Sequence, residues 1–467
     1  MNYIYVNVVS ADTPLTYEEA INCNENDLWV EAMNREIDCL NKNNTWELVK
    51  KPEGKRILDL KWVFTRKLNN LFKARIVVRG FQQKEVLEDI YSPVAKMQTL
   101  KILLSYCCQN GFFVEQMDVE TAFLNGKVKS EVYVKQPIGY EDGSDKVFRL
   151  EKALYGLRES PRAWYECFDD YLTSLNFKRS KNDYCLYYIK EGIDTIYLIL
   201  FVDDLLICSK NRVKLNYIKN LLSKRFKMKD LGKVKTYLGI DIDFKYDKQI
   251  ITLSQEKYIE SLANKYKIKD AKLFATPMEQ NLKLEFAQSA RENLKYRNLI
   301  GALLYISTGT RLDVSYSVNY LSRFQNSYDE NHFKYALRIL KYLYFTKDLK
   351  LTYKKNLNAD ILDSFVDADW AGDIVDRKST TGYVMRMYGN VIYWKSRKQN
   401  SVTKASTFAE YVALSECVSE LKVIKNTLFD FNIEVGKPID VYEDNAGAVT
   451  IAPLLTRFSR FFRLCSL

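Results

Sequence analysis

Apolar and polar residues follow patterns that divide the chain into successive regions. The segment YEEAINCNENDLWVEAMNREIDCLNKN (17–43) has a helical pattern, and at NTWELVKKPEGKR (44–56) it gives way to strand-like sequence. From there to about residue 265, short β-branched and aromatic runs such as KWVFTRKL and TIYLILFV are mixed with helical stretches such as LKILLSYCCQ. Because the regular strand–helix alternation of a doubly wound sheet is missing, this region is predicted to have an α+β fold.

The second half of the chain contains a helical region and then another strand-rich block. Residues 291–346 are mostly helical in pattern. Strands are predicted at DSFVDADWAG (363–372) and through TTGYVMRMYGNVIYWKS (380–396). A long helix (406–431) and a last strand, IDVYEDN (439–445), follow. We therefore expect a second unit with both strands and helices.

Length and composition indicate several globular domains. The chain has 467 residues, too many for one core of ordinary size, and 47% of them are hydrophobic. Only 17 glycines and 8 prolines occur, and no Ser/Gly-rich or Pro-rich linker is present. The domains are therefore expected to abut directly.

Charge is distributed unevenly along the chain. The formal net charge is +11, but residues 1–50 contain nine acidic and three basic residues, which leaves a net charge of +17 for the rest. A basic body suggests a polyanionic partner such as nucleic acid. The alternative is an ordinary basic cytosolic protein that binds no nucleic acid.

The cysteines and the single histidine exclude several kinds of site. The nine cysteines form no CxxC pair and lie mostly in apolar stretches, which is typical of reduced core residues in an intracellular protein. Zinc sites built on several histidines are excluded, and His332 is expected in the first turn of an amphipathic helix. No signal-peptide pattern occurs, and no apolar run approaches the roughly 20 residues of a membrane span, so no membrane partner is expected.

Three acidic residues follow strand-like sequence and are candidates for chemistry. Asp118 lies near the end of one such run in FFVEQMDVETAFLNG, and Asp203 and Asp204 lie between two runs, TIYLILFV and LLICS, that can pair as a hairpin. If these strands share a sheet, the acids converge and repel one another unless cations neutralise them. Two Mg²⁺ ions about 3.5–4 Å apart meet that need and support in-line phosphoryl displacement. The alternative is a surface turn, in which Asp-Asp is common.

Five ordered segments favour the chemical alternative. They are KARIVVRGFQQ (73–83), QMDVETAFLNG (116–126), KALYGLRESPRAWY (152–165), FVDDLLICSK (201–210) and LGKVKTYLGIDI (231–242). Together they resemble the reverse transcriptase of a Ty1/copia-type LTR retrotransposon. FVDADWAGD, RKSTTGYV, STFAEYVALSE and VYEDNAGAV resemble the RNase H that follows it in the same Pol polyprotein. The resemblance extends from about Trp46 to Val449.

The resemblance implies a right-hand polymerase fold and a particular order of domains. The expected order is an acidic helical N-terminal segment (1–45), reverse transcriptase fingers and palm (46–265), a helical thumb or connection region (266–360), a truncated RNase H-like α/β domain (361–453) and an aberrant tail (454–467). It also implies an intracellular protein of cytoplasmic particles or of the nucleus, and it leaves the oligomeric state open. The implied partners are an RNA template, a DNA or RNA primer and dNTPs.

The resemblance also assigns roles to individual residues. Asp118 and Asp203 bind two Mg²⁺ ions and Asp204 completes the catalytic triad of acids. Phe123 lies under the incoming sugar and excludes a 2′-hydroxyl, although a simple core aromatic is the alternative. Arg75 contacts the triphosphate, for which an ordinary surface base is the alternative.

Two further residues are implied in nucleotide binding. Tyr155 and Gly156, in the segment ALYGL, are expected to shape the nucleotide pocket.

In the second region, three acids match those of the RNase H site and a fourth is missing. Asp367, Glu410 and Asp444 correspond to the first three of four carboxylates, whereas the last segment, LLTRFSRFFRLCSL, contains no acid. Because loss of a metal ligand lowers the rate greatly, this RNase H is predicted to be inactive or nearly so. Asp369 and Asp373 are expected to be solvated loop residues. The alternative for the whole chain is a non-catalytic relic that only binds nucleic acid.

Overall fold

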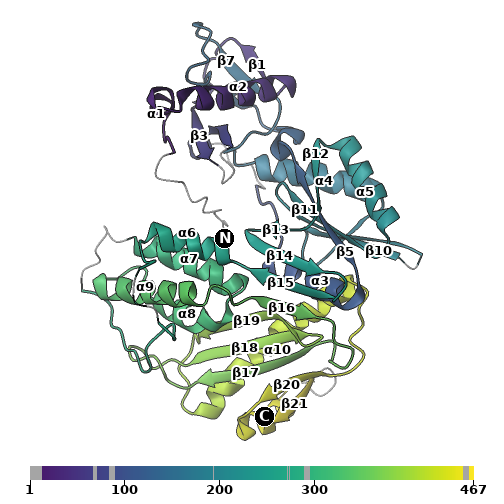
Figure 1. The fold of residues 1–467 in the computed structure, drawn as a ribbon, viewed down its shortest axis with the longest axis vertical. Helices are drawn as coiled ribbons and strands as arrows, with labels where there is room; N and C mark the ends of the chain where they lie inside the picture. Colours follow the sequence, from purple (N-terminus) through teal and green to yellow (C-terminus); the bar gives the residue numbers. More distant parts are fainter. Residues whose placement is uncertain are drawn as a thin grey trace.

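The computed structural model describes residues 13–66, 71–83, 90–192, 194–270, 272, 274–288, 295–455 and 462–466. The chain forms three bodies along the long axis of the molecule (Figure 1). The N-terminal helices and strands lie at one end, a large sheet lies in the middle, and a helical group with a second large sheet lies at the other end. Within these ranges, no helix combines the length and the apolar character that a membrane crossing requires.

The N-terminal body consists of two helices packed on small sheets. Its elements are α1 (Tyr17–Asn22), α2 (Asn26–Lys42), β1 (Trp46–Val49), β2 (Ile57–Leu58), β3 (Leu60–Arg66), β4 (Phe72–Val78), β6 (Tyr133–Val134) and β7 (Val147–Leu150). The strands form a sheet of order β1-β7-β6-β2 and the hairpin β3-β4. Trp29 of α2 is fully buried and packs edge-on against Phe64 and Phe72, with ring centroids 5.3 and 4.6 Å away. The helices predicted for the acidic start of the chain are confirmed.

The middle body is a six-stranded antiparallel sheet of order β12-β5-β11-β10-β9-β8, covered by helices on both faces. Its elements are α3 (Met97–Asn110), β5 (Phe113–Val119), α4 (Ser160–Ser174), β8 (Lys178–Arg179), β9 (Leu186–Glu191), β10 (Asp194–Phe201), β11 (Asp204–Ser209), α5 (Arg212–Arg225) and β12 (Met228–Lys233). Tyr197 of β10 pairs with Tyr188 of β9, so Tyr187 points to the opposite face. Tyr106 of α3 contacts Tyr197 and Phe168 of α4 contacts Tyr187. Burial on both faces explains the uninterrupted apolar runs of these strands.

A smaller sheet and a group of helices follow. Their elements are β13 (Thr236–Tyr237), β14 (Ile240–Lys245), β15 (Ile250–Ser254), α6 (Glu256–Lys265), α7 (Tyr296–Gly309), α8 (Ser315–Ser322), α9 (Glu330–Phe345) and β16 (Leu351–Lys354). β16 pairs with β15 although the four helices lie between them in sequence. At the start of α9, the Asp329 carboxylate accepts the N–H of His332 at 3.1 Å, and His332 Nδ1 accepts the N–H of Asp329 at 3.3 Å. The predicted position of His332 in the first turn of a helix is therefore confirmed.

The C-terminal body is a five-stranded sheet of order β19-β18-β17-β20-β21. Its elements are β17 (Asp363–Asp369), β18 (Thr380–Met387), β19 (Asn390–Lys398), α10 (Ser406–Asp430), β20 (Ile439–Glu443), α11 (Ala446–Leu455) and β21 (Phe462–Ser466). The first three strands are antiparallel, and β20 and β21 run parallel to β17. Arg463 of β21 donates to both carboxylate oxygens of Asp440 in β20, at 2.7 and 2.5 Å. The segment 462–466, predicted to be part of an aberrant tail, thus forms an edge strand of this sheet.

The middle and C-terminal bodies share one apolar core, and α3 packs against both β16 and β19. Lys101 of α3 is buried at this junction, with Nζ 3.4 Å from the ring centroid of Trp394 and 2.8 Å from the carbonyl oxygen of Thr308. Burial lowers the pKa of Lys101 well below its ordinary value. Trp394 Nε1 in turn donates to the carbonyl oxygen of Ser307 at 2.8 Å. These contacts fix the C-terminal sheet to the rest of the chain.

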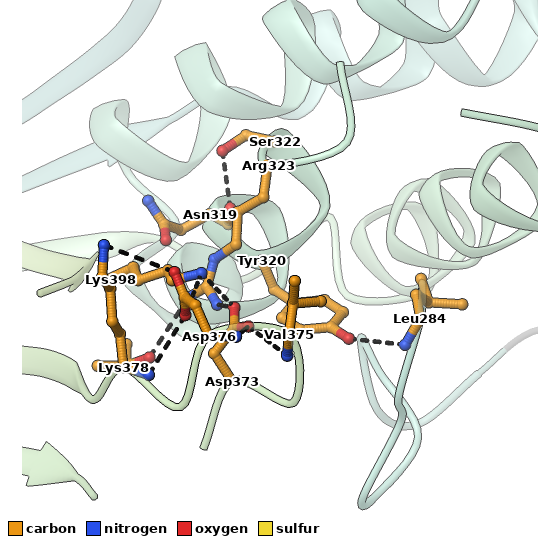
Figure 2. Close-up of polar contacts among 11 residues, drawn as sticks. Leu284, Asn319, Tyr320, Ser322, Arg323, Asp373, Val375, Asp376, Lys378 and Lys398 are labelled. Carbon is orange, nitrogen blue, oxygen red and sulfur yellow. Dashed lines mark hydrogen bonds and ion pairs between the residues drawn. The ribbon is translucent and has the colours of Figure 1, made fainter. Parts of the chain in front are cut away.

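The loop between β17 and β18 is held by a buried ion pair, which corrects one prediction (Figure 2). Asp373 was expected to be solvated but is buried, and its carboxylate lies 2.9 Å from Arg323 at the end of α8 and 2.7 Å from Lys398 of β19. Asp369 is exposed, as expected, but it is the last residue of β17 rather than a loop residue. The prediction for Asp373 was wrong because the contact with α8 joins residues far apart in sequence, and local polarity does not reveal it.

Asp373→Asn is expected to lower the free energy of unfolding by about 3 kcal/mol, because two cations lose a buried partner. Burial alone raises the pKa of Asp373, but hydrogen bonds from Lys398 and from the N–H groups of Val375 and Asp376 lower it from 3.8 to about 2. The stabilisation is therefore complete above pH 3.8 and is lost as the pH falls toward about 2. Urea denaturation between pH 7 and pH 3 should show the gap between wild type and variant narrowing with acid.

The control for this prediction is Asp376→Asn in the same loop. The Asp376 side chain is 36% exposed and pairs with Lys398 at 2.8 Å, so its removal is expected to cost less than about 1 kcal/mol. Equal losses for the two variants would contradict the special role given to Asp373.

Candidate active site

Three predicted acids come together at one end of the middle sheet. β10 and β11 are joined by a two-residue turn, Val202–Asp203. Asp204, the first residue of β11, pairs with Asp118 of β5. The N–H of Val119 donates to the carbonyl oxygen of Asp203 at 2.8 Å. The hairpin predicted from the sequence therefore exists, and its tip is tied to the end of β5.

The turn itself has an unusual backbone. Val202 has φ of +56°, a conformation that β-branched residues rarely adopt. Such strain costs about 1–3 kcal/mol and persists where the surrounding structure fixes it. Trp164 of α4 provides one such restraint, because its Nε1 donates to the carbonyl oxygen of Val202 at 2.6 Å.

The three acids lie in a partly buried environment. Asp118, Asp203 and Asp204 are each half-buried. Directly opposed residues of an antiparallel pair project to the same face, so Asp118 and Asp204 share one face with Gln116, two residues earlier in β5. Gln116 Nε2 donates to Asp204 Oδ1 at 3.2 Å. This burial and strand pairing differ from those of an ordinary solvated turn.

Arg75, Phe123 and Tyr155 lie together beside these acids. The Arg75 guanidinium carbon is 4.8 Å from the centroid of the Tyr155 ring, and the Phe123 ring is 4.6 Å from it, edge to face. Burial raises the pKa of Tyr155 to about 12, Arg75 opposes this rise, and the charges of Asp203 and Asp118 add to it. The Tyr155 hydroxyl is therefore neutral at physiological pH. Arg75, Asp203 and Asp118 therefore all lie close enough to Tyr155 to affect its pKa, and Phe123 contacts its ring.

Gly156 closes this site against β4 through backbone contacts. The N–H of Val78 donates to the carbonyl oxygen of Tyr155 at 2.8 Å. Gly156 has φ of +93°, and a Cβ atom there would lie 2.0 Å from the Val78 carbonyl oxygen. A neighbouring pocket of about 380 Å³ has the following lining residues: Lys61, Val77, Val78, Arg79, Gly80, Phe81 and Gly156. Lys61 and Arg79 give this pocket positive charge.

A second group of acids lies in the C-terminal body. Asp367 comes from β17, Glu410 from the first turns of α10, and Asp444 directly follows β20. Within the described ranges, these are the one group of three acids whose ligand oxygens all lie within 4.8 Å of one another. The sequence prediction named these three residues together. The acids at the tip of the β10–β11 hairpin are more widely spread.

The electrostatics of this second group fit a divalent cation. Burial raises the pKa of Glu410 to about 8, and the charges of Glu443, Asp367 and Asp444 add to the effect. Glu410 Oε2 is buried and has no hydrogen-bond partner among the described residues. A donor set made only of carboxylate oxygens suits hard cations such as Mg²⁺ or Mn²⁺.

Known proteins match the chain over nearly its whole length. Residues 43–280 match the family model described as "Reverse transcriptase (RNA-dependent DNA polymerase)". The chain belongs to the reverse transcriptase family. It is 36% identical over 466 residues to the Retrovirus-related Pol polyprotein from transposon TNT 1-94 of Nicotiana tabacum. The matched region covers 96% of this chain and 35% of that protein.

Two further relatives of this reverse transcriptase family member support the same assignment. It is 36% identical over 459 residues to the Retrovirus-related Pol polyprotein from transposon RE2 of Arabidopsis thaliana. That match covers 96% of this chain and 31% of the relative. It is 36% identical over 311 residues to the transposon Ty5-1 protein of Saccharomyces cerevisiae, covering 65% of this chain and 100% of that protein. The chain thus spans about a third of the length of the plant relatives. The predicted resemblance to Ty1/copia-type Pol polyproteins is confirmed.

Sequence reasoning missed several residues around both groups of acids of this reverse transcriptase. Glu36 of α2 accepts the N–H of Ile76 in β4 at 3.3 Å, beside Arg75, and no local signal in the sequence announces this contact. Gln116 was likewise not named, although its place two residues before Asp118 put it on the same face of the strand. Glu443 was missed as well, although it adjoins Asp444 in YEDN.

Proposed function

We propose that this chain catalyses RNA-directed DNA synthesis, transferring a nucleotide from a dNTP to the 3′-hydroxyl of a primer. The observation that carries this proposal is the meeting of Asp118, Asp203 and Asp204 at the end of β5 and the tip of the β10–β11 hairpin. Membership of the reverse transcriptase family supports the reaction class. The fingers, palm and thumb of a right-hand polymerase correspond in this proposal to the N-terminal body, the middle sheet and the helical group.

Asp118 and Asp203 are proposed to hold two Mg²⁺ ions, with Asp204 adding negative charge. Their donor atoms are all carboxylate oxygens at the edge of a rigid sheet, which fits a hard cation. When bound, such ions lower the pKa of the attacking hydroxyl and neutralise the leaving group. The strained turn and its bonds to β5 and α4 fix the position of Asp203, and accurate positioning supplies a large part of the acceleration.

Arg75, Phe123 and Tyr155 are proposed to form the dNTP site. The Arg75 guanidinium has the planar donor geometry that suits phosphate oxygens. Phe123 is only 9% exposed and is braced by Tyr155, so its ring is a rigid wall for the sugar. Outside the acidic start, the net charge of +17 fits a template and primer bound through their phosphates.

Phe123→Ala is expected to raise the incorporation of ribonucleotides relative to deoxyribonucleotides by about tenfold or more, because space opens at the 2′ position. Single-nucleotide incorporation with matched rNTP and dNTP, compared as kcat/KM ratios, measures this. The control is Phe113→Ala, an aromatic residue at the opposite end of β5. An unchanged ratio in Phe123→Ala would show that Phe123 is a core aromatic.

We also propose that the C-terminal body is RNase H-like. The compact group Asp367, Glu410 and Asp444 supports this proposal, and so does a sheet in which three antiparallel strands are followed by two parallel ones. The prediction that its nuclease activity is lost stays a prediction.

The test of the polymerase proposal is primer extension. Purified chain is incubated with a labelled DNA primer annealed to an RNA template, four dNTPs and Mg²⁺. Extended product is expected. A folded chain that binds the primer–template in a salt-dependent manner without extending it would instead be a non-catalytic relic.

A further inference from the structure

Glu36 is an acid on the packed face of a helix. Trp29, Met33 and Leu40 of α2 are buried and recur at helical spacing. Glu36 is half-buried and falls on the same stripe, between Met33 and Leu40. This helix lies against the β3–β4 hairpin (Figure 1). An acid in such a place needs a polar partner, because burying a carboxylate without one is unfavourable.

The free edge of β4 supplies that partner. Among the described strands only β3 pairs with β4, so alternate backbone groups of β4 point away from β3. Ile76 is 1% exposed, and its N–H donates to Glu36 Oε1 at 3.3 Å. Arg35 Nη2 donates to the carbonyl oxygen of Phe72, on the same edge, at 3.2 Å. Two consecutive residues of α2 therefore take the place of a further strand beside β4.

Arg75 lies between these two contacts. The bonds from α2 reach β4 at Phe72 and at Ile76, on either side of Arg75. The Arg75 guanidinium carbon is 4.8 Å from the centroid of the Tyr155 ring. Burial raises the pKa of Glu36, while the Ile76 hydrogen bond and the positive charge of Arg75 oppose this rise. Glu36 is thus bonded to the residue after Arg75 and is close enough to Arg75 for their charges to interact.

We propose that Glu36 is a positioning residue for nucleotide binding, which fixes the edge of β4 so that Arg75 meets the triphosphate. The inference rests on the proposed dNTP site and extends that site to the acidic helix α2. Without an acceptor, the buried N–H of Ile76 has to move toward water, and β4 moves with it. Contacts made equally in the ground state and the transition state act on KM rather than on kcat, so dNTP affinity is the property that Glu36 controls.

The test is single-turnover incorporation of one dNTP at varied dNTP concentration by the full chain. Glu36→Met fills the packed face but offers no oxygen to Ile76, so we expect the dNTP concentration for half-maximal rate to rise about tenfold. The maximal rate is expected to change less than about twofold. Glu36→Gln keeps an acceptor oxygen and is expected to stay within about twofold of wild-type affinity. The matched control is Asp38→Ala, which removes an acid from the exposed face of α2.

A second assay measures dNTP affinity without turnover. The primer is terminated with a dideoxynucleotide, and the dNTP concentration that protects the primer–template complex against competitor DNA is determined. The same order of affinities is expected for the wild type and the variants.

A double-mutant cycle shows whether Glu36 acts through Arg75. In the Arg75→Ala background, Glu36→Met is expected to weaken dNTP binding by less than about twofold further, because the positioned group is already gone. A merely structural role of Glu36 would add the same factor in both backgrounds and would overturn the inference. Equal losses in Glu36→Gln and Glu36→Met would overturn it as well, since the acceptor oxygen would then not matter.

The failure of this inference can be told apart from the failure of the proposed dNTP site. If Arg75→Ala leaves dNTP affinity unchanged, the proposed role of Arg75 fails and the inference fails with it. If Arg75→Ala weakens dNTP binding while Glu36→Met matches Asp38→Ala, the role of Arg75 stands and that of Glu36 is overturned. Should Glu36→Met fail to fold, as judged by circular dichroism, Glu36→Ala replaces it, and wild-type dNTP affinity in that variant overturns the inference.

Discussion

Asp203→Asn is expected to slow nucleotide incorporation on an RNA template by about a thousandfold, equivalent to ~4 kcal/mol of transition-state stabilisation. The amide cannot supply the negative charge that a divalent cation requires, while its size preserves the turn. Single-turnover incorporation of one dNTP by enzyme in excess over primer–template measures the effect. Primer–template affinity is expected to change little, because phosphate contacts dominate it.

Asp247→Asn is the matched control for this variant. Asp247 lies in the turn between β14 and β15, so it is also an aspartate at a hairpin tip, but it is exposed. Its substitution is expected to leave the rate unchanged. Similar rates for the two variants and the wild type would remove Asp203 from the chemistry.

Gly156→Ala is expected to cost roughly 3 kcal/mol or more of folding stability and to lower polymerase activity. Adopting φ of +93° costs an alanine about 1–2 kcal/mol. The added Cβ atom would also lie 2.0 Å from the Val78 carbonyl oxygen, and relieving such overpacking costs about 1–3 kcal/mol. The N–H of Val78 donates a hydrogen bond to the carbonyl oxygen of Tyr155. A backbone shift that relieves the overlap is therefore expected to displace the Tyr155 ring as well. Thermal denaturation and primer extension measure the two effects.

Gly143→Ala separates the two contributions to this loss. Gly143 has φ of +77°, but a Cβ atom there would meet nothing within 4 Å. This variant therefore carries the backbone strain without the overlap and is expected to keep full activity. Equal destabilisation by the two variants would mean that β4 moves away from the added Cβ atom at little cost. It would contradict the expected cost of the overlap between residue 156 and Val78.

The elements around the hairpin acids could be predicted because their signals are local. Uninterrupted apolar runs mark β10 and β11 as strands buried on both faces, and the adjacent acids mark the tip of the hairpin, where Asp203 lies in the turn and Asp204 begins β11. Asp118 could be predicted as a candidate because it lies near the end of a strand-like run. The sequence could not state that β5 lies next to β11, yet that pairing brings Asp118 opposite Asp204.

Other features escaped prediction because they depend on distant contacts. Asp373 is polar and flanked by loop residues, and only its pairing with Arg323 shows why it is buried. β16 pairs with β15 across four helices, which no local periodicity encodes. Glu443 stands next to another acid in YEDN, so the local sequence gives no sign that it is buried. Its burial follows from the packing of its face of β20 in the core.

The central claim is that divalent cations held by Asp118 and Asp203 drive nucleotide transfer, and a Mg²⁺ titration tests it most directly. The rate of single dNTP incorporation on an RNA template is followed in the wild-type chain from EDTA to saturating Mg²⁺. We expect no incorporation in EDTA and a rate that rises more steeply than a single binding site allows, since two ions act together. Incorporation that persists in EDTA, or no incorporation at any Mg²⁺ concentration by folded chain bound to primer–template, would contradict the claim.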